Sequence, residues 1–406
     1  MSEKASAATE RYSKRRGEIV SAAMKVLNEE GVKGMTLSEV ATLVGLNTTS
    51  LTYYFRKKED LAAACHMSAI DLINSAVLAA SIEATPAARI TAFIKLMFKL
   101  NADYRRKNGP QLGMLGDLRA LDEPQRSVVV QHFSGMVLNL RALFQSFEHS
   151  FSHSELRARA YLLLDQLHWA TLWVMQCELE EYPRLCARFT DILLNGFAKN
   201  DASWPPSIID PEEIFPVQPD NGREIFLRAS TRVFTRLGYS SASVDKISAE
   251  LHVTKGSFYH HNETKEELAL ACYERTRQVG SSAYAVALRT NDLMFDRLSS
   301  GIASTLAFQT SQYGPLLRPL SLRGLPRPLR DEVWSRTRRQ VNSLAGYVSD
   351  GIADGSIRAI DPIIGANVLF STSHTASSAI NWTTDGVGHD LVNLLAKPTL
   401  HGLLTT

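Results

Sequence analysis

The stretch that decides the fold is TLSEVATLVGLNTTSLTYYFRKKEDL, from Thr36 to Leu61. The same pattern returns without a gap as SVDKISAELHVTKGSFYHHNETKEEL, from Ser243 to Leu268. Two ungapped copies at one fixed offset indicate a duplicated unit. Each copy has the pattern of two short helices joined by a tight turn, and a third helix is expected to start after a Lys-Glu pair.

In the first copy, the start and stop signals stand at the positions that a helix-turn-helix requires. Thr36 and Glu39 have capping-box spacing before an apolar run, which predicts the start of a helix. Gly45 fits the left-handed position that ends this helix, and Asn47 is a good N-cap for the next one. That next helix opens with the small polar residues 48–50, which are typical of a recognition helix whose first turn meets base edges and phosphates.

The segment VTKGSFYHHNETKEEL, from Val253 to Leu268, resembles the signature of the TetR family of transcriptional regulators. LNTTSLTYYFRKKEDL, from Leu46 to Leu61, is a looser match to the same signature. The resemblance implies an all-α fold made of two tandem TetR-like units. In each unit, a helix-turn-helix DNA-binding domain would be followed by a helical domain that binds a small molecule and dimerises.

The residues expected to face DNA are taken from matching positions of the two copies. They are Thr36, Asn47, Thr48, Thr49, Ser50, Thr52, Tyr53, Tyr54 and Lys58 in the first, and Ser243, Thr254, Lys255, Gly256, Ser257, Tyr259, His260, His261 and Lys265 in the second. Because base readout depends on the donors and acceptors at these positions, the two copies are expected to prefer different sequences. His252 replaces Gly45 and Asn262 replaces Phe55, which leaves open that one copy is degenerate.

Positive charge gathers around both copies, although the whole chain carries a net charge of only +2. Residues 11–58 hold nine Lys or Arg against four Asp or Glu, and residues 223–265 hold seven against four. Such excesses fit phosphate contact, and they also fit a solvated basic face. The basic N-terminal arm around residues 11–16 either follows the DNA backbone and a minor groove or is a solubilising, disordered tail.

The domain organisation follows from the duplication and from a proline-rich stretch between the copies. The predicted units are a first DNA-binding domain with its arm (1–62), a first helical domain (63–199), a linker (200–221), a second DNA-binding domain (222–269) and a second helical domain (270–406). Proline at the density of the linker cannot continue a helix, so the linker is expected to be extended. Its apolar side chains predict that it lies against one of the helical domains.

Apolar periodicity predicts further helices around the two copies and in the helical domains. They are expected at 17–30, 61–81, 87–106, 111–121, 125–147, 155–179 and 183–198 in the first half, and at 223–237 and 266–288 in the second. By the resemblance, the interface helices would be 155–178 with 191–197, and 361–382 with 391–404. One linker joins the halves at high effective concentration, so an intramolecular pseudo-dimer is favoured over a homodimer.

Candidates for a ligand pocket are aromatic, apolar or His side chains of the helical domains, and for each of them a place in the core is favoured over a ligand contact. They are Phe93, Met97, Leu115, His168 and Trp169 in the first half, and Phe308, Trp334, Phe370 and His374 in the second. A lining of this kind predicts an apolar or aromatic effector.

The remaining features exclude several classes of protein. The sequence has no phosphate-cradling glycine loop, nucleophile elbow or paired-carboxylate motif, so we expect neither an enzyme nor a cofactor or metal. Four scattered Cys residues do not make a disulfide framework. A secretory signal and a long uninterrupted apolar run are both missing, which predicts a cytoplasmic protein with no membrane partner.

The sequence therefore leads to one preferred function and one alternative. The preferred function is a sequence-specific DNA-binding repressor, with a double-stranded DNA operator read by two non-identical heads and a small-molecule effector that releases it. The alternative is a ligand-sequestering or protein-interaction module whose helix-turn-helix sequences are unused. Steep loss of DNA affinity with salt would distinguish the two.

Overall fold

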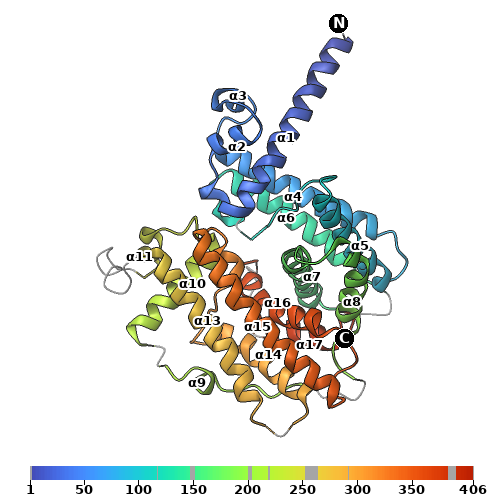
Figure 1. The fold of residues 1–406 in the computed structure, drawn as a ribbon, viewed down its shortest axis with the longest axis vertical. Helices are drawn as coiled ribbons and strands as arrows, with labels where there is room; N and C mark the ends of the chain where they lie inside the picture. The colour runs from blue at the N-terminus through green and yellow to red at the C-terminus, as the bar shows by residue number, and fades with distance from the viewer. Residues whose placement is uncertain are drawn as a thin grey trace.

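The computed structural model describes residues 2–116, 118–146, 151–199, 204–217, 220–251, 264–290, 292–382 and 390–405. Within these ranges the chain is α-helical, and its one β feature is an isolated antiparallel bridge between Ala198 and Ile357. The all-α prediction is therefore confirmed. Figure 1 shows the first half at the top and right, the second half below it, and a long N-terminal helix that projects from the top.

The first half consists of a head, α1 to α3, and a body, α4 to α8. Its helices are α1 (Ser2–Gly34), α2 (Leu37–Leu43), α3 (Thr48–Thr52), α4 (Lys58–Ala80), α5 (Pro86–Arg105), η1 (Leu118–Ala120), α6 (Gln125–Ala142), α7 (His153–Val174), η2 (Leu179–Glu181) and α8 (Tyr182–Asn195). Helix α4 is long and apolar enough, by length and composition alone, to cross a membrane, but half of that window is buried inside the protein (50%), as in the core helix of a bundle.

The second half repeats this order after the linker. Its helices are α9 (Pro211–Ile214) in the linker, α10 (Gly222–Leu237) and α11 (Val244–Leu251) in the second head, and α13 (Lys265–Ala287), α14 (Met294–Thr310), η3 (Pro319–Leu322), α15 (Arg327–Ala353), α16 (Pro362–Trp382), the π-helical η5 (Val392–Ala396) and α17 (Lys397–His401) in the second body.

The two halves make matching contacts where each head joins its body. Helices α4 and α13 are both 23 residues long and correspond residue for residue from their first lysines onward. The Cys65 thiol lies 3.6 Å from the Val20 carbonyl oxygen, and the Cys272 thiol lies 3.5 Å from that of Leu227. All four of these residues occupy matching positions of the two halves, so the two Cys residues are buried structural side chains.

Two sequence predictions need correction. The basic N-terminal arm is not a disordered tail, because α1 starts at Ser2 and continues through it to Gly34 with a break at Gly31. Its Ala, Glu, Lys and Arg residues are good helix formers. The helix expected at 111–121 is also wrong except for the short turn η1: Asn28 donates to the Leu112 carbonyl (2.9 Å) and accepts from the Met114 amide (2.9 Å), so this backbone is bonded outside a helix.

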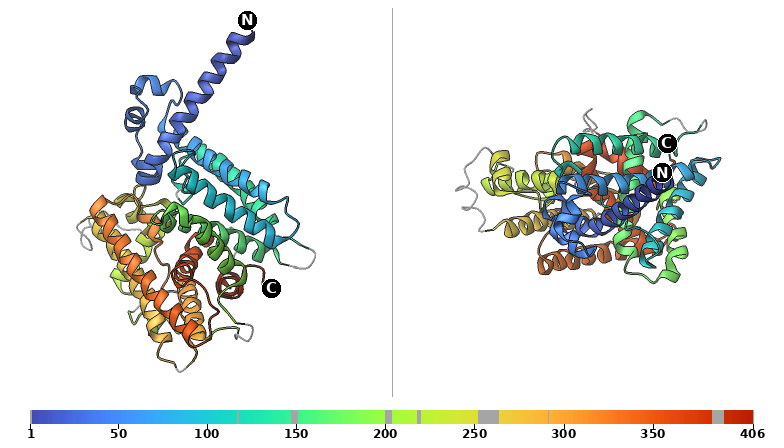
Figure 2. Two further views of the ribbon diagram at one scale, coloured as in Figure 1. Left: turned by 45° about the vertical axis from the view of Figure 1, so that its right-hand side comes forward. Right: turned by 90° about the horizontal axis from the view of Figure 1, so that it is seen from above.

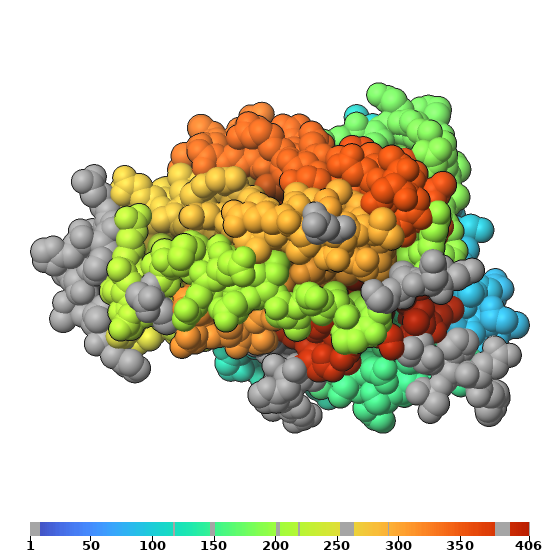
Figure 3. Space-filling view, turned by 90° about the horizontal axis from the view of Figure 1, so that it is seen from below, coloured from blue at the N-terminus to red at the C-terminus, as the bar shows by residue number. Residues whose placement is uncertain are grey.

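The linker lies against the second body, as its apolar side chains predicted. Ile214 and Phe215 are buried there, and the Phe215 ring centre is 6.4 Å from that of Phe308. The Ile209 amide donates to the Ser304 hydroxyl at 2.8 Å. In the view from below, the yellow-green chain that includes the linker runs along the second half (Figure 3).

The two halves meet along helices α7 and α16, which lie side by side at the centre of the molecule (Figure 2, left). The Gln166 side-chain amide donates to the Val368 carbonyl at 3.0 Å and to the Thr372 hydroxyl at 2.9 Å. The Trp169 indole N–H donates to Asn367 at 2.9 Å. These buried bonds join the helices in the pairing that the sequence predicted for the interface.

Candidate nucleic-acid interface

The first head has the helix-turn-helix geometry that its capping residues predicted. The Thr36 hydroxyl caps α2 by accepting from the Glu39 amide at 3.2 Å, and Gly45 has a φ of 66° in the turn. The Asn47 side chain caps α3 by accepting from the Ser50 amide at 2.7 Å. Leu51 buries the inner face of α3, so an apolar contact and the cap both help to fix the helix.

The outer face of α3 is polar and open to solvent. Asn47, Thr48 and Thr49 are exposed, Ser50 and Thr52 are half-buried, and the Tyr53 side chain is 74% exposed. Hydroxyl and amide groups at the first turn of a helix are suited to phosphate oxygens and base edges. The structure therefore brings these sequence-predicted residues together on one accessible surface.

Aromatic contacts hold the basic part of α1 beside this surface. The Tyr12 ring stacks on Tyr54 with centroids 5.0 Å apart, and Tyr54 meets Tyr53 edge to face at 5.3 Å. The Arg15 guanidinium donates to the Val44 carbonyl at 2.8 Å, and the Arg16 guanidinium lies over the Phe55 ring at 4.7 Å. The basic residues thus extend the polar surface of α3 along α1.

Two lysines of the predicted site are bonded within the heads. The Lys58 ammonium donates to the Lys33 carbonyl at 2.9 Å. Its counterpart Lys265 donates to the Tyr239 and Ala242 carbonyls, both at 3.2 Å, and burial lowers the pKa of Lys265. Both lysines therefore fasten the first helix of a body, α4 or α13, to the chain just before the reading unit of its head. Phosphate contact through their remaining protons stays a prediction.

The second head is described up to Leu251 and again from Thr264. The Ser243 hydroxyl accepts from the Lys246 amide at 3.3 Å, and Thr264 starts α13 with a capping box. Thr254, Lys255, Gly256, Ser257, Tyr259, His260 and His261, together with His252 and Asn262, lie outside the described residues. In the described part, Arg232 and Arg236 are paired with Glu250 at 3.0 and 3.1 Å, which neutralises part of the basic excess counted from the sequence.

The ligand-pocket candidates separate into core, interface and cavity residues. Phe93, Met97 and Phe308 are fully or almost fully buried in the cores. Trp169 lies at the interface between the halves, with its ring centroids 5.0 Å from Phe370 and 6.0 Å from Trp334. The remaining candidates line cavities: Leu115 and His168 one between the halves, and Phe370 and His374 one in the second body.

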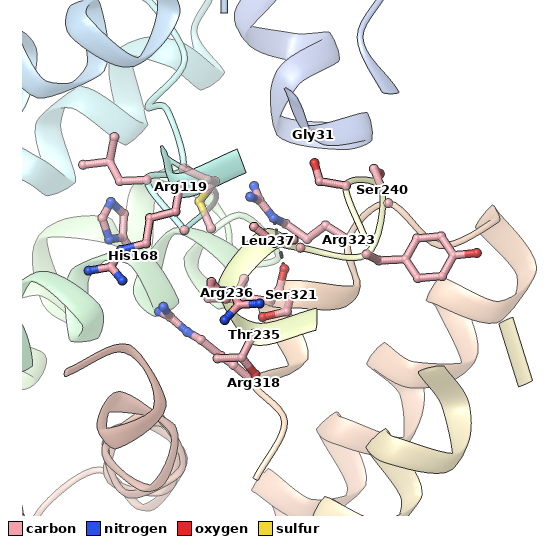
Figure 4. A pocket seen from close by; sticks show the side chains of 18 of the residues that line it. Gly31, Arg119, His168, Thr235, Arg236, Leu237, Ser240, Arg318, Ser321 and Arg323 are labelled. Carbon is pink, nitrogen blue, oxygen red and sulfur yellow. Dashed lines mark hydrogen bonds between the residues drawn. The ribbon is translucent and has the colours of Figure 1, made fainter. Parts of the chain in front are cut away.

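The cavity between the halves is small, about 70 Å³, and its lining is rich in arginine (Figure 4). Arg119 is the second residue of η1 in the first half, and Arg323 is the matching residue of the second half. The Arg318 guanidinium is paired with Asp165 at 2.9 Å. Burial, with Arg318 and Arg323 nearby, lowers the pKa of His168 to about 3, so its imidazole is neutral at pH 7.

Around this cavity each head rests on the opposite half, which sequence reasoning missed. The Arg323 guanidinium donates to the Asn28 carbonyl of the first head at 3.2 Å, and η1 of the first half packs against α10 of the second head. At Gly324 an added Cβ would lie 3.5 Å from the Glu30 carbonyl oxygen of the first head. The repeated LRAL and LRGL segments were the available signal, but repetition alone did not reveal that they contact the other half's head.

The second cavity lies inside the second body and holds about 640 Å³. Its walls come from α13, α14, α15 and α16, and they include Tyr273, Tyr284, Tyr347, Phe370 and His374. This volume is in the range of sites for small organic ligands. Among the described residues, no cluster of three or more His, Cys, Asp or Glu side chains could hold a metal ion.

The fold and the first head define a class: an all-α protein with a helix-turn-helix head on a helical body. Residues 19–65 and 226–272 both match the family described as "Bacterial regulatory proteins, tetR family". The chain therefore belongs to the tetR family of bacterial regulatory proteins, as a tandem member in which the family's N-terminal domain occurs twice.

Two curated relatives and one solved structure are similar to parts of the chain. The HTH-type transcriptional regulator BetI of Rhizobium meliloti (strain 1021) is 29% identical over 32% of this chain and 66% of its own length. RutR of Escherichia coli (strain K12) is 29% identical over 27% of this chain and 58% of its own length. AibR in complex with isovaleryl coenzyme A and operator DNA has 17% identity and a TM-score of 0.33, covering 45% of this chain and 100% of that one. The matches thus span less than two thirds of the two relatives' own lengths.

Proposed function

We propose that the chain is a DNA-binding transcriptional regulator, a repressor that leaves its operator when a small effector binds. The observation that carries the proposal is the exposed polar face of α3, with Asn47, Thr48 and Thr49 at its first turn and the basic part of α1 beside it. This surface has the chemistry of a recognition helix, and it occupies the domain that matches the tetR family. The relatives BetI and RutR are named as transcriptional regulators, which supports the same role here.

The two heads are proposed to read one operator from a single chain. Helices α7 and α16 pair within the chain, so one chain presents two heads where a conventional family member would need two subunits. The heads differ in sequence at the reading positions, which favours an operator with two unlike half-sites. Half-sites on one face of DNA recur at about 34 to 36 Å, one helical turn.

Effector release is proposed to work through the contacts between heads and bodies. Each head rests on the opposite half around the arginine-lined cavity, so a change of one body's shape would alter the spacing of the heads. A small apolar or aromatic molecule would occupy a body cavity. By linkage, a ligand that weakens DNA binding must itself bind the DNA complex more weakly than the free protein.

Selection of bound genomic fragments with the intact chain tests this proposal. Two unlike half-sites one turn apart are expected, with affinity that falls steeply as salt rises. A palindrome would indicate homodimers that read through one type of head. If no fragment were enriched, and affinity did not depend on salt, the chain would be a ligand-sequestering or interaction module instead.

A further inference from the structure

The two bodies differ in the helix that enters each from its head. The cavity-lining face of α13 includes Arg277 and Gly280. The matching residues of α4 are Ile70 and Ile73, both fully buried in the core of the first body. In the first body, two large apolar side chains therefore fill this space. In the second body, Arg277 reaches outward and Gly280 has no side chain, so the space stays open.

The helix that packs beside this one, α6 in the first body and α15 in the second, also differs between the two bodies. In the first body, α6 is bonded along the length of α4: the Gln125 side chain donates to Asp60 at 2.8 Å, and that of Asn139 donates to Asn74 at 2.9 Å. In the second body, the Tyr273 hydroxyl donates to the Val333 carbonyl at 3.1 Å, near the head. Farther from the head, the Gln340 side chain donates to the Arg277 carbonyl at 3.2 Å, and the remaining space between α13 and α15 is the cavity of about 640 Å³.

A hollow of similar size in the first half, about 630 Å³, is not the counterpart of this cavity. It is lined by Gly17 and Val20 of α1 and by Asp60, Met67 and Asp71 of α4. Those α4 residues lie on a different face of the helix from Ile70 and Ile73, so this hollow is a groove between head and body. The start of α6 also lines this groove, through Gln125, Val128 and Val129. In the part of the chain that the structure describes, the face of α4 with Ile70 and Ile73 is therefore filled, whereas the matching face of α13 opens into the cavity.

The inner wall of the second-body cavity is aromatic, and it includes a buried polar atom of His374 that lacks a partner. The rings of Tyr284 and Tyr347 lie 6.4 Å apart, and the Phe370 and His374 rings lie 4.6 Å apart. His374 Nδ1 is buried and has no hydrogen-bond partner among the described residues. A buried polar atom of this kind is costly unless a ligand or water satisfies it.

The outer wall carries positive charge. Arg277, Arg336 and Arg339 line the cavity, and none of its described lining residues is acidic. The first two are paired with Glu274, which lies outside the lining. Arg339 is exposed and has no ion pair among the described residues, so its guanidinium is available to an anion.

We propose that the second body is the chain's receptor for a single amphipathic anion, while the first body takes no ligand of this kind. The apolar part of the ligand lies among Tyr284, Tyr347 and Phe370, and its acidic group meets Arg339. This inference rests on the proposed function, since it names the effector's chemical class and its site. It also makes the regulation one-sided, because α13 runs from the cavity to Lys265, which holds the loop of the second head.

Two matched dyes test the proposal on the intact chain: anionic anilinonaphthalene sulfonate and its uncharged analogue N-phenylnaphthylamine. Fluorescence titration and equilibrium dialysis give affinity and stoichiometry. We expect one saturable site per chain, with the anion bound about tenfold more tightly, as for one charge-assisted hydrogen bond at a partly exposed site.

Variants locate the site. At Gly280 an added Cβ would have its nearest neighbour at 3.9 Å, so Gly280→Ile fills the cavity as Ile73 fills its counterpart and should weaken both dyes more than about tenfold. Gly346→Ile is the matched control, since a Cβ there meets nothing within 4 Å. Arg339→Gln should weaken the anion about tenfold and leave the neutral dye unchanged, whereas the adjacent, exposed Arg338→Gln should change neither.

The proposal is overturned by two equivalent sites per chain, by no saturable binding of the anion, or by equal affinity for both dyes. It is also overturned if the Arg339 variant binds the anion normally, a result that does not depend on how well the Gly280 variant folds. Operator binding is titrated separately. Salt-dependent DNA binding without dye binding contradicts the receptor alone, and dye binding without DNA binding contradicts the regulator and leaves the receptor in place.

Discussion

At the scale of single residues, the pair of Arg318 and Asp165 joins the two halves at a buried point. Their charged atoms lie 2.9 Å apart, with side chains only 12% and 11% exposed. An ion pair in such a place adds little net stability over apolar side chains, but removal of one partner leaves an uncompensated charge. The pair therefore fixes how the halves fit together more than how strongly they adhere.

We predict that Asp165→Ala destabilises the chain by about 3 kcal/mol, because Arg318 would keep its charge in a buried site. Urea unfolding measures the loss as a lower midpoint concentration of urea, with the slope of the unfolding free energy against urea unchanged. Asp71→Ala is the control, since Asp71 pairs with His132 on the surface and should change stability by less than about 0.5 kcal/mol. Equal effects of the two changes on the free energy of unfolding would show that removing one partner of the buried pair costs no more than removing one partner of a surface pair.

His168 and His374 predict a pH dependence of stability. Burial, with nearby arginines, lowers the pKa of both imidazoles from the ordinary 6.5 to about 3. Below about pH 6.5 the unfolded chain gains protons that the folded chain does not, so stability is complete above this pH and falls towards pH 3, by about 1.4 kcal/mol per pH unit for each His.

The measurement is urea unfolding at about pH 7.5 and about pH 5, compared with the double variant His168→Gln, His374→Gln. The wild type should lose about 1 to 2 kcal/mol per His more than the variant over this window. An identical pH dependence of the two proteins would mean that neither imidazole is held neutral.

At the scale of elements, the reading helix α3 depends on its cap, because five residues make a helix too short to persist alone. We predict that Asn47→Ala, which removes the bond to the Ser50 amide, costs α3 about 1 kcal/mol and lowers operator affinity about fivefold. Global stability should change little, since the fraying is local. Fluorescence anisotropy with operator DNA and thermal melting measure the two effects.

The variant Asn47→Ser distinguishes the loss of the helix cap from the loss of a direct base contact by Asn47. Serine is about as good an N-cap as asparagine, so α3 should stay intact. If the cap is what matters, Asn47→Ser binds DNA nearly as the wild type does. Loss of affinity in both variants would assign Asn47 a direct contact with DNA instead.

Elements with local signals were predictable from the sequence, and elements fixed by distant contacts were not. Thr36, Gly45 and Asn47 act within a few residues of the chain, so their roles followed from spacing. The segment at 111–121 has helical periodicity, but its backbone bonds go to Asn28, far away in the sequence. Lys58 also matched a DNA-facing position, yet its ammonium is bonded to Lys33, which only the folded head reveals.

At the scale of the whole molecule, the positions of the heads depend on the joint between the halves. Arg323 of the second half holds α1 of the first head through Asn28, and η1 of the first half supports α10 of the second head. The halves are also held by Arg358, which donates to the Gly196 carbonyl at 2.7 Å and pairs with Asp191 at 2.7 Å. Helices α7 and α16, which the resemblance to the family assigned to the interface, thus pack against each other within the chain.

This use of the interface predicts that the chain is a monomer in solution and on its operator. Sedimentation equilibrium of the intact protein should give the mass of one chain, 45.0 kDa, and the operator complex should contain one chain that protects both half-sites. The physical reason is that α7 and α16 bury one face of each helix against the other, joined by the bonds from Gln166 to Thr372 and from Trp169 to Asn367, so these faces are not open to a partner subunit. Gln166→Ala with Trp169→Ala should weaken this joint and reduce affinity for the two-site operator far more than for a single half-site, because the second head would no longer be held in place. A mass of two chains on the operator, unchanged by these substitutions, would assign the pairing of heads to a homodimer rather than to the joint within the chain.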